Sequence, residues 1–192
     1  MANSVHTPIG ILSFPHLFSP RPRAPGGEPV YQCSLLFDQQ AQRSPAYAAL
    51  KRAVAECIEE EFGTGKSRDS GFVAGLRLPF RKCSEKQYKG YDIPGGFYIS
   101  PWTKSRPGVI DAQRNEITLA EDVWAGQLAR ITVAAFAYNT SGNRGVSFAL
   151  NNVQICRTDG ERLDGRRAAK DEFPDYDGPG AMAGADADDV PF

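Results

Sequence analysis

The stretch Leu128-Ala-Arg-Ile-Thr-Val-Ala-Ala-Phe-Ala-Tyr138 decides the fold class of this chain, because its two faces differ in character. Residues at every second position share one face of an extended chain. Ile131 and Val133 therefore share a face. Phe136 and Tyr138 lie on the opposite one. The stretch predicts a β-strand with one face in a core and a second face that carries aromatic rings.

Further segments repeat this β pattern and are separated by glycine-rich turns. The predicted strands cover residues 8–18, 28–37, 76–80, 95–102 and 146–157. The pair Asn151-Asn152 interrupts the last of them and predicts a β-bulge. A mainly β chain of short strands with one helix indicates a small barrel or sandwich. The pattern alone does not select an OB-fold over other small barrels.

One segment has helical spacing instead. Ser44 is a suitable N-cap for a helix that begins at Pro45, and Gly63 is placed to end it. An apolar stripe runs between these residues: Tyr47, Leu50, Val54, Cys57, Ile58 and Phe62. We predict a helix over residues 45–62 whose stripe packs on the sheet.

The strand faces that point away from the predicted core combine cations with aromatic rings. Single-stranded DNA requires both, because cations neutralise phosphates and ring faces stack on bases of any sequence. The segment 81–91, with Lys86 and Tyr88, would extend this surface. Phe136 and Tyr138 would alternatively cover a second core against the helix. The candidate DNA-binding residues are Arg77, Arg81, Lys82, Tyr98, Trp102, Lys104, Arg106, Arg130, Phe136 and Tyr138.

The net charge of −1 hides a division of the chain. Residues 1–170 hold all 22 Lys and Arg against 16 Asp and Glu, whereas residues 171–192 hold seven acids and no Lys or Arg. This asymmetry indicates a basic functional body with an acidic interaction tail. The tail is too poor in apolar residues to offset its ordering entropy. We therefore predict a DNA-binding domain at 1–165 and a disordered acidic tail at 166–192.

The end of the chain forms a compact recognition element. A terminal phenyl ring fits a pocket, while the neighbouring carboxylates meet a basic rim and proline limits the entropy lost on binding. An inert solubilising tail is the alternative. The candidate partner-binding residues are Asp186, Asp188, Asp189, Val190, Pro191 and Phe192.

The sequence shows no arrangement of residues typical of a catalytic or metal site, so we expect no enzyme, no cofactor and no metal site. Gly63-Thr-Gly-Lys-Ser67 looks like the end of a phosphate-binding loop, but Glu60 stands where that pattern needs a glycine. The scattered cysteines fit buried free thiols of a reducing compartment. They are Cys33, Cys57, Cys83 and Cys156.

Two resemblances agree with this interpretation. The segment 188–192 resembles the acidic Asp-Asp-Ile-Pro-Phe tip of bacterial single-stranded DNA-binding proteins, with Val190 in place of isoleucine. Residues 145–157, leading into 159–165, are similar to a phage family of single-stranded DNA-binding proteins, formerly described as a domain of unknown function. That resemblance implies an OB-fold with a helix inserted between early strands, non-specific DNA binding along a basic aromatic face, and a tail that contacts partner proteins.

These observations lead to one expected function. The chain is expected to coat and protect single-stranded DNA in phage replication, recombination and repair, and to recruit replication or recombination proteins through its tip. An RNA-binding or strand-annealing factor on the same fold, and an adaptor that acts through the tail, remain alternatives. No membrane span or signal peptide is visible, so we expect the host bacterial cytoplasm. The sequence leaves the oligomeric state open, including a homodimer.

Overall fold

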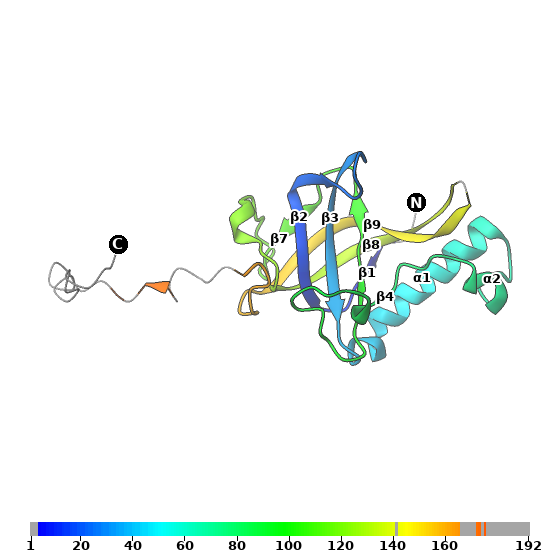
Figure 1. Ribbon diagram of the computed structural model, residues 1–192, viewed down its shortest axis with the longest axis horizontal. Coiled ribbons are helices and arrows are strands. Elements are labelled where there is room, and N and C mark those ends of the chain that lie inside the picture. Colours follow the sequence, from blue (N-terminus) through cyan, green and yellow to red (C-terminus); the bar gives the residue numbers. More distant parts are fainter. Residues whose placement is uncertain (1–3, 141, 166–171, 174, 176–192) are drawn as a thin grey trace, which may run out of the picture.

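The computed structural model describes residues 4–140, 142–165, 172–173 and 175. In this part of the chain a nine-stranded sheet curls into a barrel with one long helix beside it (Figure 1). None of the described helices is long and apolar enough to cross a membrane. The elements are β1 (Val5–His6), β2 (Gly10–Pro22), β3 (Pro29–Phe37), η1 (Ala41–Arg43), α1 (Pro45–Phe62), α2 (Ser70–Ala74), β4 (Arg81–Lys82), η2 (Cys83–Glu85), β5 (Phe97–Ile99), β6 (Trp102–Thr103), β7 (Gly108–Ile110), η3 (Ala120–Asp122), β8 (Leu128–Thr140) and β9 (Asn143–Arg157).

The strand pairings form a closed ring. β2 pairs with β3, β3 with β6, β6 with β9, β9 with β8, and β8 pairs again with β2. All of these pairs are antiparallel except β6 with β9. A ring that visits its strands in this order is the Greek-key barrel of the OB-fold. The predicted mainly β barrel with an inserted helix is confirmed, since α1 follows β3 and precedes β6 in the chain.

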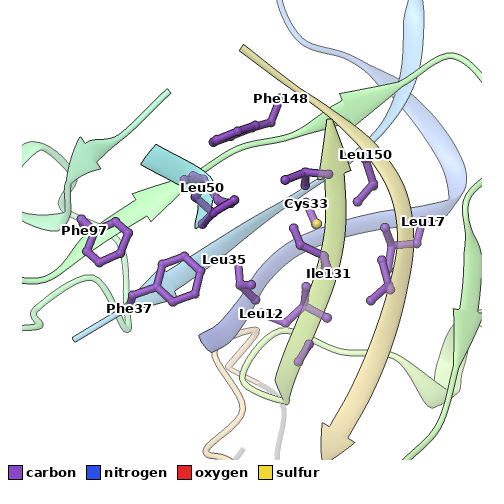
Figure 2. Packing of buried hydrophobic residues seen from close by; sticks show 14 of the residues in the cluster. Leu12, Leu17, Cys33, Leu35, Phe37, Leu50, Phe97, Ile131, Phe148 and Leu150 are labelled. Atoms are coloured by element: carbon purple, nitrogen blue, oxygen red, sulfur yellow. The ribbon is translucent and has the colours of Figure 1, made fainter. Parts of the chain in front are cut away.

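The core fills the inside of this barrel (Figure 2). Leu12, Leu35 and Ile131 are at most 1% exposed. At the end next to α1, the rings of Phe37 and Phe97 stack with centroids 4.8 Å apart. Burying one such leucine side chain contributes about 1.5–3 kcal/mol to the free energy of unfolding, so this core holds the strands in register.

Helix α1 has the bounds that the sequence predicts. The Ser44 hydroxyl accepts a hydrogen bond from the amide of Tyr47 at 3.2 Å, and Gly63 follows the last turn. Leu50 and Ile58 on its inner face are buried in the barrel core. The helix packs against β8 and β1. It therefore covers one side of the barrel and leaves other faces open.

Strands β8 and β9 form the long hairpin that extends from the barrel toward α2 (Figure 1). The alternation predicted for β8 is confirmed, because Ile131 is 1% and Val133 0% exposed. Thr132 pairs with Asn152 and the next residue pairs with Leu150, so Asn151 is the extra residue of a bulge. The bulge predicted at this pair of asparagines is confirmed.

The strand predicted at residues 76–80 is largely absent. Only Arg77 makes a β-bridge, in parallel with Gly145 at the start of β9. Leu76 is buried and Phe80 packs partly buried against the core, as the alternation predicted. The segment bends at Leu76 and Pro79, so it meets the start of β9 at Arg77 without a continuous ladder.

Candidate nucleic-acid interface

An open groove of about 880 Å³ crosses the barrel on strands β2, β3, β5, β6, β8 and β9. Its polar floor includes Ser34 and Ser100, whose hydroxyls are 2.8 Å apart. The cations and rings that line it are Phe14, His16, Arg23, Arg77, Arg81, Lys86, Tyr88, Tyr91, Tyr98, Trp102, Phe136, Tyr138 and Phe148. Six of the ten candidate DNA-binding residues are in this set.

One end of the groove is built around Trp102. Its half-buried indole meets the ring of Phe136 edge-on, with centroids 5.6 Å apart and an interplanar angle of 83°. The guanidinium of Arg23 lies 5.5 Å from the indole centroid. Tyr138 lies two residues beyond Phe136 on the same strand and also lines the groove. The prediction that Phe136 and Tyr138 face the same surface as Trp102 is therefore confirmed, and neither ring is fully buried.

The groove carries an excess of positive charge. Among its described lining residues, Arg23, Arg77, Arg81 and Lys86 face one acid, Glu85. All four cations are exposed, and none forms an ion pair within the described part of the chain. Exposed cations whose charge is not neutralised by a carboxylate can attract a polyanionic backbone.

The position of Arg77 depends on Gly145. The Arg77 amide donates to the carbonyl of Arg144 at 3.0 Å, and the Val146 amide donates to the carbonyl of Arg77 at 2.9 Å. A Cβ added at Gly145 would lie 2.2 Å from the Arg77 carbonyl oxygen. Only glycine permits this approach, so the backbone contact fixes where the Arg77 side chain enters the groove.

The expectation that Tyr98 is an exposed stacking ring is wrong. Tyr98 is 7% exposed and belongs to a small second core with Leu36, Cys83 and Tyr91. The segment that follows β4 covers the outer face of β5, and burial raises the pKa of the Tyr98 hydroxyl. Tyr98 still lines the floor of the groove, but it supports other rings there.

Four of the candidate residues lie outside the groove lining. Lys104 forms an ion pair of 2.6 Å with Glu28, and the Arg106 guanidinium lies 5.1 Å from the ring centroid of Phe18. Lys82 is exposed on β4. The Arg130 side chain donates to Gln154 at 2.8 Å, near β7. Arg130 precedes Phe136 by about 20 Å of extended strand. Alternation places both residues on one face of β8, but the groove does not extend along the strand as far as Arg130.

Sequence reasoning missed Phe14, His16 and Arg23 as candidates. The register of β2 against β3 shifts between Ser13 and His16, and this irregularity turns the Phe14 ring outward. No alternation rule predicts that. Arg23 belongs to a loop rich in proline and arginine, and that basic composition beside a strand end was the available signal.

The loop that looked like a phosphate-binding loop is engaged with an internal carboxylate. Glu59 accepts hydrogen bonds from the amides of Gly65 and Ser67 and from the Ser67 hydroxyl. These bonds, with the Ser67 hydroxyl first, hold the pKa of Glu59 below its usual value. The loop is thus a turn closed by the preceding helix, which explains its glycines and serine without a nucleotide.

Comparison with known proteins decides the family. Residues 5–183 match the family of the Enterobacter phage Enc34 ssDNA-binding protein. The chain belongs to this family. Its relatives include protein p50 of Acyrthosiphon pisum secondary endosymbiont phage 1, which is 30% identical over 169 residues and is matched over 85% of this chain and 89% of its own length. The family is one of DNA-binding proteins and not of enzymes, as the sequence predicted.

Solved structures share the fold. The Enc34 protein in complex with ssDNA has a TM-score of 0.62 at 21% identity, covering 83% of this chain and 89% of that one. Gp2.5 of bacteriophage T7, a single-stranded DNA-binding protein, has a TM-score of 0.56 at 14% identity, covering 86% of this chain and 98% of that one. At these identities the likeness supports the fold. Of the predicted acidic tail at 166–192, the structure describes only residues 172–173 and 175. The tip from Asp186 to Phe192 lies outside the described residues.

Proposed function

We propose that the chain binds single-stranded DNA without sequence preference in the groove around Trp102. The observation that carries the proposal is the pairing of exposed arginines with half-buried rings along one open surface of a barrel. Its family membership supports the same ligand. The contacting residues are Arg23, Arg77, Arg81, Trp102, Phe136 and Tyr138, with Lys82, Lys104 and Arg106 as flanking cations.

The chemistry of binding follows from these side chains. A base stacked on Trp102 contributes about 1–3 kcal/mol to the free energy of binding, whatever its identity. Arg77 and Arg81 neutralise phosphates and release counterions, so affinity falls as salt rises. No bond is made or broken in the DNA.

The cellular role that we propose is protection of single-stranded DNA during phage replication, recombination and repair in the host cytoplasm. The tip formed by Asp186, Asp188, Asp189, Val190, Pro191 and Phe192 would recruit a partner protein. The acidic tail would compete with DNA for the basic groove until DNA displaces it.

Tryptophan fluorescence tests the proposal. The chain has two tryptophans, and Trp124 lies away from the groove under the guanidinium of Arg162 at 4.9 Å. The variant Trp124→Phe therefore isolates the signal of Trp102. We expect oligo(dT) to quench that signal in a saturable titration, with a log–log salt slope of about −0.7 per phosphate neutralised.

A matched titration with oligo(rU) separates DNA from RNA, because only RNA offers 2′-hydroxyl groups. Tighter binding of oligo(rU) would favour the RNA-binding alternative on the same groove. A flat titration with both oligomers would reject the groove as a nucleic-acid site and leave the tail adaptor as the function.

A further inference from the structure

We infer that Phe14 and Tyr88 form a second platform for an unpaired nucleobase, separate from the Trp102 site and serving the same strand. The inference rests on the proposed function, because it extends the path of the DNA along the groove. Both residues line that groove, and their rings meet edge-on with centroids 5.2 Å apart. Phe14 is 44% and Tyr88 53% exposed, so together they present an apolar patch to solvent, a feature that often marks a binding site.

The platform is held from below by a buried ring. Tyr91 is 3% exposed, and its centroid lies 5.8 Å from that of Tyr88 and 6.5 Å from that of Phe14. Tyr91 in turn packs edge-on against Tyr98 at 5.3 Å. The exposed rings are therefore fixed in place before a base arrives, which lowers the entropy lost on stacking.

The turn that carries Tyr88 is also anchored from behind. The Tyr91 amide donates to the carbonyl of Tyr88 at 3.0 Å. The ammonium of Lys89 pairs with Glu161 at 3.0 Å and donates to the carbonyl of Arg162 at 3.0 Å. These contacts bind the turn to the segment that follows β9, so the Tyr88 ring is displayed by a fixed loop.

Phe14 adopts a backbone conformation that phenylalanine avoids. Its φ is 47°, in the left-handed region that favours glycine, and it is one of two non-glycine residues with positive φ among the described residues. Such strain persists where a side chain is needed in a particular place. Here it turns the ring out of β2 and onto Tyr88.

A cation completes the site. The ammonium of Lys86 lies 5.8 Å from the centroid of the Tyr88 ring and lines the same groove. A base on the ring with a phosphate at a neighbouring ammonium is the arrangement that a single strand presents. The ligand of this platform is thus one nucleotide of a strand that also reaches Trp102.

Affinity for oligo(dT) of about 16 nucleotides, the upper site size of one OB-fold, tests the platform. Tyr88→Ala is expected to weaken binding by about 5- to 150-fold, the range for loss of one base stack. Tyr88→Phe keeps the ring face and is the matched control, with unchanged affinity expected. Because Tyr88 is exposed, both variants should keep the melting temperature of the parent, which is checked by circular dichroism.

Photocrosslinking locates the base directly. Oligo(dT) that carries 5-iododeoxyuridine should crosslink to the peptide with Tyr88 or to that with Phe14, besides the peptide with Trp102. Normal affinity of Tyr88→Ala, beside weakened binding of Trp102→Ala, would overturn the platform and leave the proposed function standing. Failure of the parent protein to bind oligo(dT) at all would instead overturn the proposed function.

Discussion

The guanidinium carbon of Arg23 lies 5.5 Å from the centroid of the Trp102 indole. A cation over this ring occupies a face on which a nucleobase would stack, so DNA and Arg23 compete for it. Arg23 is an exposed residue between β2 and β3. On the proposed function, we expect Arg23 to leave the ring when a base stacks there and to neutralise a phosphate of the bound strand.

Arg23→Gln is therefore expected to make the salt dependence shallower by about 0.7 in log–log slope, the effect of one phosphate contact. Oligo(dT) affinity measured at several salt concentrations gives the slope. Arg43→Gln is the control, because Arg43 belongs to η1 and does not line the groove. Equal slopes for both variants would show that Arg23 makes no phosphate contact.

A second prediction contrasts two arginines that sequence alternation treated alike. Arg77 lines the groove, whereas Arg130 donates to Gln154 at 2.8 Å outside it. Arg77→Gln should weaken oligo(dT) binding and reduce the salt slope, while Arg130→Gln should leave both near the parent values. Affinity measured at low and moderate salt checks this. A loss with Arg130→Gln as large as that with Arg77→Gln would move the DNA path toward β7.

The third prediction concerns the backbone contact behind Arg77. Gly145→Ala places a Cβ 2.2 Å from the Arg77 carbonyl oxygen and 2.8 Å from the Tyr138 hydroxyl. Overpacking of this kind destabilises by about 1–3 kcal/mol, and each kcal/mol lowers the melting temperature by about 2–4 °C in a chain of this size. Displaced Arg77 and Tyr138 should also weaken DNA binding.

Gly71→Ala is the matched control for that variant. Its Cβ would meet only the Asp69 carboxylate at 3.5 Å, an ordinary contact, and the position lies in the short helix α2. Thermal unfolding should show an unchanged or slightly raised melting temperature for it. Equal melting temperatures for the two variants would mean that β9 moves away from Arg77 without a loss of stability, which would contradict the prediction.

Most of the fold was predictable from local patterns, and the reasons lie in particular residues. Ser44, Pro45 and Gly63 define the helix by chemistry that acts within one turn. The alternation of β8 works because only one side of that strand meets the core. Closure of the barrel through the parallel pairing of β6 with β9 was not readable, since it joins Trp102 to Ala149 across 47 positions of sequence.

The site was predictable where alternation holds and not where another segment covers a strand. Trp102, Phe136 and Tyr138 line the groove as expected. Tyr98 does not expose its ring, because Cys83 and Tyr91 lie over it, and no pattern within β5 shows what packs on its outer face. The outward position of the Phe14 ring depends on a register shift between β2 and β3, and alternation within one strand does not predict such a shift.

The fourth prediction is a pH dependence of DNA binding through His16. Burial, and secondarily the charge of Arg21, lower the pKa of His16 below its ordinary 6.5 in the folded protein. The unfolded chain then binds the proton more readily, so the stability of the fold decreases as pH falls below about 6.5 toward the lower pKa of the folded protein. A phosphate in the groove has the opposite effect, because it stabilises the imidazolium.

Oligo(dT) affinity is therefore expected to rise between about pH 7 and pH 5, with uptake of a proton on binding. His16→Gln should flatten this rise while keeping the affinity near pH 7. Titration calorimetry in buffers of different ionisation enthalpy measures the proton uptake. If His16→Gln has the same pH profile of oligo(dT) affinity as the parent protein, no DNA phosphate lies near His16.

The fifth prediction concerns the acidic tail, residues 171–192, which carries seven acids and no Lys or Arg. If the tail occupies the basic groove, its removal after Lys170 raises oligo(dT) affinity. The gain should be largest near 0.01 M salt, where charges act over about 30 Å, and should vanish near 1 M, where they act over about 3 Å.

Removal of Phe192 alone keeps every aspartate side chain, so it should leave DNA affinity unchanged while abolishing capture of a partner protein. Competition between the tail and DNA is electrostatic, so its effect on affinity is strongest at low salt. Equal affinities of the full chain and the truncated chain at low salt would therefore show that the tail does not occupy the groove.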